Sequence, residues 1–216
     1  RGQSPVLVSP KRSNLIPSNI KQIEARISEF SCLEGVIRPG SVVYYLIGDM
    51  TPYNSRTNPS RHIETNLTLF VRFLEWLRDI GGVHVVFVSS GGAIYGDSDI
   101  QPTHEGVQPN PKSFYAVLKL AAEQHLRLFA SQADMTYTVA RVSNPYGPDQ
   151  EFKHGQGLVP KVIDHILNDV PIDVFGDGKS VRDYVHIRDL TSALFECGAR
   201  PSAIDQTINI GTGVGK

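Results

Sequence analysis

Tyr115 and Lys119 lie four residues apart in a segment with helical character, so their side chains share one face of that helix. A phenol normally loses its proton near pH ~10, which makes it a poor base at neutral pH. A lysine ammonium one turn away stabilises the phenolate and lowers that pKa. The pair therefore suits removal of a hydroxyl proton while hydride leaves the same carbon. The alternative is a packed tyrosine beside a solvated lysine, because ordinary helices often contain this spacing.

A second candidate is the segment SSGGAIYG, residues 89–96, which follows a buried apolar strand. Its hydroxyls and small residues are expected at the mouth of that strand, where ligands of open α/β sheets bind. Ser89 and Ser90 are the hydroxyls that could serve the tyrosine. A plain glycine-rich turn explains the same segment equally well.

Two later segments could hold a charged ligand. In ARVSNPYGP, residues 140–148, Asn144 could present its amide to a ligand or only cap the turn. In VFGDGKSVRDYVHIRDL, residues 174–190, Arg182 could clamp a diphosphate in bidentate fashion or form a surface ion pair with Asp183. The final GTGVGK fits neither the dinucleotide fingerprint nor the Walker loop, so it is not taken as a phosphate loop.

The elements that must position these residues alternate between strands and helices. Apolar runs predict strands at 6–8, 42–47, 83–88, 136–142, 172–175 and 207–210. Helices are predicted over 61–80, from Asn110 or Ser113 to 131, over 158–168 and over 187–197, and the first shows a stripe at Ile63, Leu67, Val71 and Leu74. The order predicts an α/β fold with a doubly wound parallel sheet.

Composition excludes several classes of protein. The chain has 216 residues, 40% of them hydrophobic, with 21 basic and 22 acidic residues and a net charge of -1. Such balance does not indicate a nucleic-acid or membrane-surface partner, and no apolar run reaches the ~20 residues of a membrane span. The seven histidines show no metal-ligand spacing, so no metal is expected. Only Cys32 and Cys197 occur, which favours a reduced, cytoplasmic setting.

Four segments occurring in order, FVSSGGAIYG, SFYAVLK, ARVSNPYGP and VFGDGKSVRDYVHIRDL, resemble the extended short-chain dehydrogenase/reductase family, in its nucleotide-sugar epimerase/dehydratase branch. The resemblance runs from Val6 to Lys216. It implies a Rossmann-like domain that binds NAD(P), expected over residues 1–150, and a small, partly missing lobe for the sugar nucleotide. That lobe is expected over 151–216, interleaved with elements that return to the Rossmann sheet.

The same resemblance implies roles for individual residues. Tyr115 is implied as catalytic base, with Lys119 as its tuner and as a ligand of the nicotinamide ribose. Ser89 and Asn66, the latter in ETNLT, are implied on the cofactor side of the site. The substrate side is implied to hold the diphosphate through Asn144 and Arg182, to place Phe175 near the uracil, and to include Leu158.

Departures from the family pattern qualify these expectations. The usual catalytic Ser/Thr position is Gly91, which leaves two alternatives: Ser90 or Ser89 substitutes for it, or Tyr115 acts alone. The family's first strand and glycine-rich turn, roughly 30 residues of a βαβ unit, are missing, which predicts a longer native protein. Lys11 and Arg12 stand near the place of the acid that binds the adenosine ribose, which mildly favours NADP over NAD.

The leading hypothesis is a UDP-sugar 4-epimerase that works through transient oxidation by bound NAD. The positions that hold an Asp-Glu pair in the family's dehydratases are Gly92 and Ala93 here, so no acid is available to eliminate water. The alternatives are an NAD(P)-dependent reductase or dehydrogenase of nucleotide sugars, and a non-catalytic nucleotide-binding protein of the same fold. A homodimer through the helices of Asn66 and Tyr115 is expected.

Overall fold

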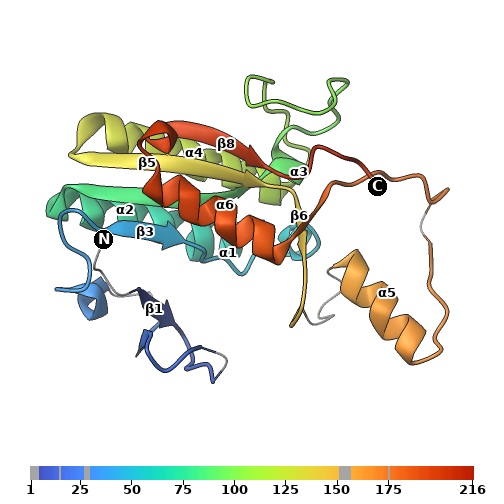
Figure 1. The fold of residues 1–216 in the computed structure, drawn as a ribbon. Coiled ribbons are helices and arrows are strands. Elements are labelled where there is room, and N and C mark those ends of the chain that lie inside the picture. The colour runs from blue at the N-terminus through green and yellow to red at the C-terminus, as the bar shows by residue number, and fades with distance from the viewer. Residues whose placement is uncertain (1–4, 15, 27–29, 151–156, 175) are drawn as a thin grey trace.

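The centre of the molecule is a parallel sheet of four strands in the order β3-β4-β5-β8 (Figure 1). The computed structural model describes residues 5–14, 16–26, 30–150, 157–174 and 176–216. The strands are β3 (Val42–Tyr45), β4 (Val83–Ser90), β5 (Met135–Val142) and β8 (Gln206–Ile210). The long register of β4 on β5 ends with Ser90 beside Val142, so the segments after both strands begin at one edge of the sheet.

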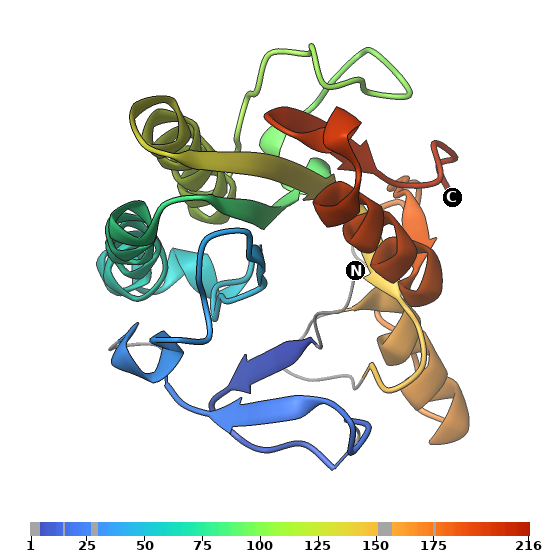
Figure 2. The ribbon, with the colours of Figure 1, turned by 60° about the vertical axis from the view of Figure 1, so that its left-hand side comes forward.

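Helices cover both faces of this sheet. The helices α2 (Leu69–Ile80) and α4 (Phe114–Gln132) pack together on one face, and α6 (Ile187–Ala199) covers the other (Figures 1 and 2). Alternate residues of β4 serve the two layers: Val85 and Phe87 pack with α2 and α4, whereas Val86 packs with α6. Burial on both faces explains the continuous apolar run of β4. The predicted Rossmann-like α/β fold is confirmed.

The long helical segment before Gly81 differs in detail from its prediction. It comprises α1 (Pro59–His62), a π-helical stretch η3 (Ile63–Thr68) and α2, and the side chain of Asn58 caps its start. The residues that α2 buries are Phe70, Phe73, Leu74 and Leu77, so of the predicted stripe only Leu74 is fully buried. Because a π turn takes more residues than an α turn, η3 shifts the phase of the pattern and leaves Ile63 exposed.

The start of α4 is settled by its cap. The Ser113 side chain accepts a hydrogen bond from the Ala116 backbone N–H, so Ser113, not Asn110, is the N-cap. The helix α3 (Gly91–Ile94) starts directly after β4. The glycine-rich segment is thus a short helix that begins where the strand ends, beside the first turns of α4.

Smaller elements lie outside the main sheet. The strands β1 (Val6–Ser9) and β2 (Lys21–Glu24) form a separate parallel pair, as do β6 (Asn144–Tyr146) and β7 (Tyr184–His186). The remaining helices are α5 (Leu158–Leu167) and the 3₁₀ turns η1 (Phe30–Leu33), η2 (Asn54–Arg56) and η4 (Pro201–Ala203). Figure 1 shows α5 standing apart from the sheet.

One predicted strand is wrong and another is shorter than expected. Residues 172–174 have no strand pairing, and Phe175 lies outside the described residues. An apolar run becomes a strand only where a neighbour accepts its backbone hydrogen bonds, and 172–174 have none among the described strands. The run 42–47 likewise ends as a strand at Tyr45, the last residue paired with β4.

Candidate active site

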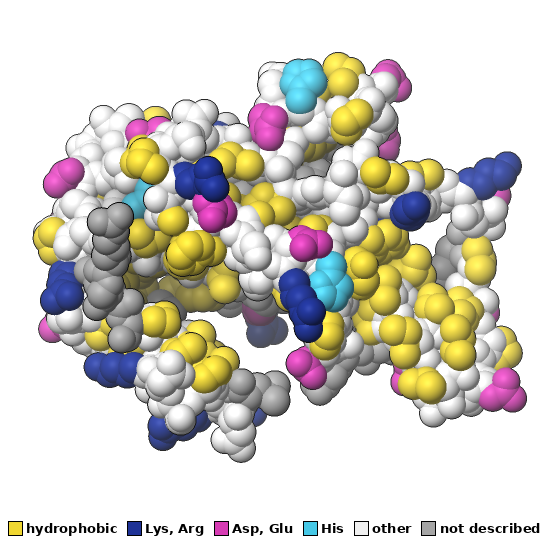
Figure 3. All heavy atoms as spheres, viewed as in Figure 1, with side chains coloured by type: hydrophobic (Ala, Val, Ile, Leu, Met, Phe, Trp, Pro, Cys, Tyr) yellow, Lys and Arg dark blue, Asp and Glu magenta, His cyan; other side chains and the backbone are white. Residues whose placement is uncertain are grey.

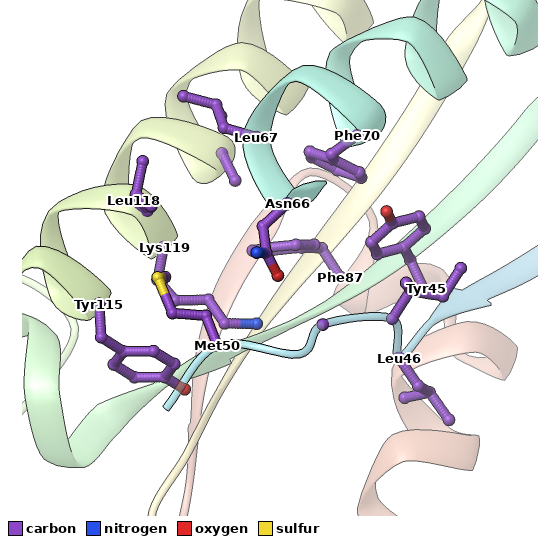
Figure 4. A pocket seen from close by; sticks show the side chains of 13 residues that line it. Tyr45, Leu46, Met50, Asn66, Leu67, Phe70, Phe87, Tyr115, Leu118 and Lys119 are labelled. Carbon is purple, nitrogen blue, oxygen red and sulfur yellow. The ribbon is translucent and has the colours of Figure 1, made fainter. Parts of the chain in front are cut away.

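Tyr115 and Lys119 lie in the first two turns of α4 and border a pocket between that helix, the π-helical stretch and the ends of β3 and β4. Figure 4 shows their polar groups and the Asn66 amide directed toward the same space. The other lining residues are mainly apolar: Tyr45, Leu46, Ile47, Gly48, Met50, Leu67, Phe70, Phe87, Leu118 and Ala122. The structure therefore brings together three of the predicted site residues, from two helices.

The Lys119 ammonium is held against the end of β4. Its Nζ donates to the backbone carbonyl of Val88 at 2.9 Å, and it lies 5.0 Å from the ring centre of Phe87 and 6.0 Å from that of Tyr115. Burial lowers the pKa of Lys119 to about 8, although the nearby Glu123 carboxylate raises it. Lys119 is therefore a cation at neutral pH that sits close to its titration point.

The expected lowering of the Tyr115 pKa is wrong for this structure. Burial raises the pKa of Tyr115, and the opposing influence is a hydrogen bond from the Ser90 side chain. Lys119 is bonded to Val88 rather than to the phenol, so its charge does not overcome the loss of solvent around the ring. Tyr115 is thus a neutral phenol that holds its proton in this structure.

The two candidate serines have different partners. The Ser90 side chain acts on Tyr115 in the direction that lowers the pKa of the phenol, and its role as the hydroxyl that replaces the usual Ser/Thr stays a prediction. Ser89 is buried, and its Oγ donates to the Glu123 carboxylate at 2.6 Å. In this arrangement the Ser89 hydroxyl is engaged by Glu123 and not by a cofactor. The cofactor role of Ser89 stays a prediction.

Glu123 and Arg141 were not among the predicted site residues. Glu123 follows Lys119 by four residues, which places it one turn further along the same face, and Arg141 interrupts an otherwise apolar strand. Their side chains form an ion pair of 2.7 Å with 0% and 3% exposure. Both residues could have been found from the sequence, because a charged residue at a position that the apolar pattern predicts to be buried needs a buried partner.

Gly91 stands where the family pattern has a side chain, and the packing explains it. A Cβ on Gly91 would lie 3.1 Å from the backbone oxygen of Arg141. Glycine thus allows α3 to start in close contact with the end of β5.

Asn66 forms the opposite wall of the pocket from within η3. Its Nδ2 donates to Asp49 Oδ1 at 2.8 Å and to the His62 carbonyl at 3.1 Å, and its Oδ1 accepts from the Asp49 backbone N–H at 3.2 Å. The amide therefore fastens the loop after β3 to the helix. That loop supplies Met50 to the pocket.

The predicted substrate residues lie elsewhere on the surface. Asn144 bonds the Asp183 carbonyl through both its backbone N–H and its Nδ2, at 2.9 and 3.0 Å. Arg182 is exposed and donates to the Val181 carbonyl, while Asp183 binds Thr212 and Gly213 instead of the arginine. Leu158 is exposed at the start of α5. None of these three is among the described residues that line the pocket, and Phe175 lies outside the described part of the chain.

The pocket combines apolar side chains with a few polar groups, a pattern typical of small-molecule sites. Its walls are largely apolar, which suits the faces of a flat ring, and its few polar groups converge from Asn66, Tyr115 and Lys119. Within the described ranges, no three His, Cys, Asp or Glu side chains are grouped as metal ligands. None of the helices in the described part of the chain has the length and apolar character to cross a membrane.

Comparisons with known proteins agree with this geometry. A dTDP-4-dehydro-6-deoxyglucose reductase of Escherichia coli is 35% identical over 79% of this chain and 54% of its own length. A UDP-glucose 4-epimerase of Mycolicibacterium smegmatis is 34% identical over 80% of this chain and 55% of its own. The chain therefore spans about half the length of these relatives.

A solved structure shows the same fold across the chain. The crystal structure of UDP-glucose 4-epimerase with UDP-glucose from Thermotoga maritima superposes with a TM-score of 0.90 at 30% identity, over 100% of this chain and 71% of that one. Residues 3–211 match the NAD dependent epimerase/dehydratase family, which confirms the predicted NAD cofactor. With nearly its whole length matched and its Tyr115, Lys119 and Asn66 at one pocket, the chain belongs to the NAD dependent epimerase/dehydratase family.

Proposed function

We propose that the protein is a UDP-sugar 4-epimerase acting through transient oxidation of its substrate. The observation that supports this most strongly is the grouping beside the end of β4: Tyr115 and Lys119, one turn apart on α4, border one pocket, and Lys119 is bonded to the Val88 carbonyl. Such a group can move a proton at one hydroxyl in both directions. Reversible transfer at a single carbon is what an epimerase requires.

Each residue has a distinct task in this proposal. Tyr115 exchanges a proton with the sugar 4-hydroxyl, Ser90 bonds the phenol, and the Lys119 cation stabilises the phenolate form. Bound NAD would supply the hydride acceptor and donor. Asn66, Ser89, Tyr115 and Lys119 are the residues proposed to hold it, with NADP as the less favoured choice. Because burial keeps the Tyr115 pKa high, the phenol holds its proton in this structure, and its use as a base depends on the Lys119 cation to stabilise the phenolate.

Epimerisation is preferred to dehydration because the residues after Gly91 carry no acid. Gly92 and Ala93 occupy the first turn of α3, next to β4. Elimination of water needs a group that protonates the departing hydroxyl. Neither residue can do so.

The substrate is proposed to lie along the segments that follow β5 and precede α6. Asn144 and Arg182 would bind the diphosphate, Phe175 would lie near the uracil, and Leu158 would belong to the lobe that encloses the sugar. We retain residues 1–150 as the NAD(P)-binding domain and 151–216 as the partial substrate lobe. The elements β8 and α6 of the second range pack with the main sheet, whereas α5 does not.

A reductase of keto-sugar nucleotides is the second candidate. The observation in its favour is the 35% identity to the dTDP-4-dehydro-6-deoxyglucose reductase. A reductase would consume NAD(P)H in proportion to product, and it would use the same tyrosine as proton donor. Net cofactor turnover therefore separates the two reactions.

We also propose that two copies associate through α4 and η3 in a cytoplasmic homodimer. Phe114, Val117 and Leu128 lie on one exposed face of α4, and Ile63 is exposed on η3. Two such faces would bury one another in a four-helix arrangement. Light scattering should give a dimer mass for the native chain and a monomer mass for Val117→Glu/Leu128→Glu; a native monomer would contradict the dimer.

The decisive experiment is a proton NMR time course of the complete native protein with UDP-glucose, then UDP-N-acetylglucosamine, and catalytic NAD. Appearance of the galacto epimer without net NADH supports the epimerase. Product that requires stoichiometric NADH or NADPH, with a keto-sugar nucleotide as substrate, supports the reductase. Unchanged spectra under all these conditions would favour a non-catalytic nucleotide-binding protein.

A further inference from the structure

A fully buried carboxylate lies directly beneath the proposed catalytic pair. Glu123 is on α4, four residues after Lys119, and its side chain is 0% exposed. It accepts hydrogen bonds from Ser89 at 2.6 Å, from two nitrogens of Arg141 at 2.7 and 3.1 Å, and from Arg127 at 3.2 Å. Each oxygen therefore has two donors, which a buried carboxylate needs if it is to remain charged.

Stability alone is a weak reason for such an arrangement. Removing two charges from water costs about as much as their attraction returns, and an apolar pair of similar volume often stabilises a fold equally well. The pair becomes expensive only when it is broken, because one charge is then buried without a partner. The better reason for a buried ion pair beside the candidate site is therefore that it holds the surrounding elements in a fixed position.

The network fixes several elements to α4 at once. Arg141, on β5, also donates to the Tyr95 hydroxyl at 2.9 Å, and that hydroxyl donates to Asn209 on β8 at 2.7 Å. Arg127 bonds both Glu123 and Thr207 of β8. The carboxylate is thus the point at which α4 is tied to the carboxyl ends of β4 and β5 and, through its arginines, to β8.

Three successive residues of β4 each contact a different residue of α4. The Val88 carbonyl accepts from Lys119, the Ser89 hydroxyl donates to Glu123, and the Ser90 side chain acts on Tyr115 in the direction that lowers the pKa of the phenol. The α4 partners are spaced by four residues, so they form one line along the helix. Of these three contacts, only the one with Glu123 is fully buried and charge-assisted.

We propose that Glu123 is a positioning residue, which sets the register of α4 on β4 and thereby places Tyr115 and Lys119 relative to Ser90. Arg141 acts with it as the fixed partner on β5. The kinetic consequence of this register rests on the epimerase proposed above. The register itself does not, since it can be measured through Lys119 alone.

The charges around Lys119 determine what a substitution should do. The polar and titratable groups of the elements packed around it are Tyr115, Glu123 and Arg127 on α4, Ser90 on β4, Arg141 on β5, Tyr95 after α3, and Asp49 and His62 beyond Asn66. Glu123 is the group whose negative charge raises the pKa of Lys119 against the effect of burial. Glu123→Gln removes that charge and loosens the register.

The test is Glu123→Gln in the complete native chain, with two readouts. NMR of ¹³C-labelled lysine, with the Lys119 signal assigned by Lys119→Arg, should show Lys119 titrating at lower pH than in the native protein, with weakened contacts to Val88. In the NMR epimerase assay, kcat should fall by about tenfold or more while KM changes less than twofold, because misplacement affects the chemical step. Glu196→Gln, which removes a carboxylate from the exposed pair with Arg200, is the matched control and should change neither.

A folded Glu123→Gln protein with an unchanged Lys119 titration and unchanged kcat overturns the proposal. If Glu123→Gln does not fold, Glu123→Gln/Arg141→Gln removes both charges and avoids an orphaned arginine. The folded double variant should still show a reduced kcat and a perturbed Lys119 signal, and native behaviour would overturn the proposal. A native protein without epimerase activity, in which Glu123→Gln nevertheless weakens the NMR contacts between Lys119 and Val88, would contradict the proposed function and leave the positioning role supported.

Discussion

The contact between β4 and α4 that includes Val88, Ser89, Lys119 and Glu123, called the seam below, is closely packed and hydrogen-bonded. The region around α5 is lightly packed. Along the seam, backbone, hydroxyl and carboxylate groups of both elements bond one another, and the surrounding side chains are buried. On α5, by contrast, Leu158, Ile163, Ile166 and Leu167 are all more than half exposed, and Figure 3 shows hydrophobic side chains gathered over this helix. The groups proposed for chemistry are therefore preorganised, whereas those proposed for substrate binding lie on lightly packed segments.

This difference has a functional meaning. Proton transfer needs reacting groups held within a fraction of an ångström, which a packed core provides. Recognition of a nucleotide tolerates segments that settle around the ligand. Substitutions along the seam should therefore change kcat, and substitutions in the second region should change KM.

The largest effect is expected for Tyr115→Phe, which removes the proton-transfer group from the seam. The kcat of epimerisation should fall by about a thousandfold, the upper range for acid–base groups, with little change in the melting temperature. The NMR time course measures it. Tyr137→Phe, near the opposite end of β5, is the matched control. Activity retained in Tyr115→Phe would remove the basis of the mechanism.

Ser90→Ala should have the next largest effect. The Tyr115 phenol loses its hydroxyl partner, so kcat should fall by about a hundredfold, as when one preorganised donor is deleted. Ser89→Ala instead leaves the Glu123 carboxylate short of a donor and should lower the free energy of unfolding by about 1–3 kcal/mol. Urea unfolding of both variants beside their kinetics checks the distinction. Equal kinetic losses in both would show that the serines are not divided as the hydrogen bonds indicate.

In the lightly packed region, Arg182→Ala should raise KM for the UDP-sugar by about tenfold and leave kcat within twofold. The reason is the loss of a charge-assisted contact with the diphosphate. Lys179→Ala removes a neighbouring exposed cation, paired with Asp177, and serves as control. Initial rates over a range of substrate concentrations separate the two constants. An unchanged KM would place the diphosphate elsewhere.

The smallest effect concerns stability and pH. Burial lowers the folded pKa of Lys119 to about 8, below its unfolded value, so the unfolded chain binds more protons between those two values. The stability of the native protein should therefore rise with pH across this window. Lys119→Met should stabilise the fold by about 1 kcal/mol at pH 7, and the advantage should shrink by pH 10. Urea unfolding at pH 7, 8.5 and 10 tests this; a constant advantage would contradict it.

Much of the fold followed from the sequence because its signals are local. Continuous apolar runs indicated strands buried on both faces, and β4 and β5 lie where those runs predicted them. The four-residue spacing of Tyr115 and Lys119 is a property of any helix, so their shared face required no knowledge of neighbours. The family resemblance rested on four such local segments.

Other features depended on where distant segments meet. The partners of Ser89 and Ser90 depend on the docking of α4, and the strand predicted at 172–174 failed because no neighbour pairs with it there. The stripe of α2 shifted because a π turn precedes it. The Tyr115 pKa rose instead of falling because desolvation is set by the whole surrounding structure. The sequence by itself determined the candidate residues and their spacing, since helical geometry is local, while the tertiary structure alone decided their burial, hydrogen-bond partners and charge state.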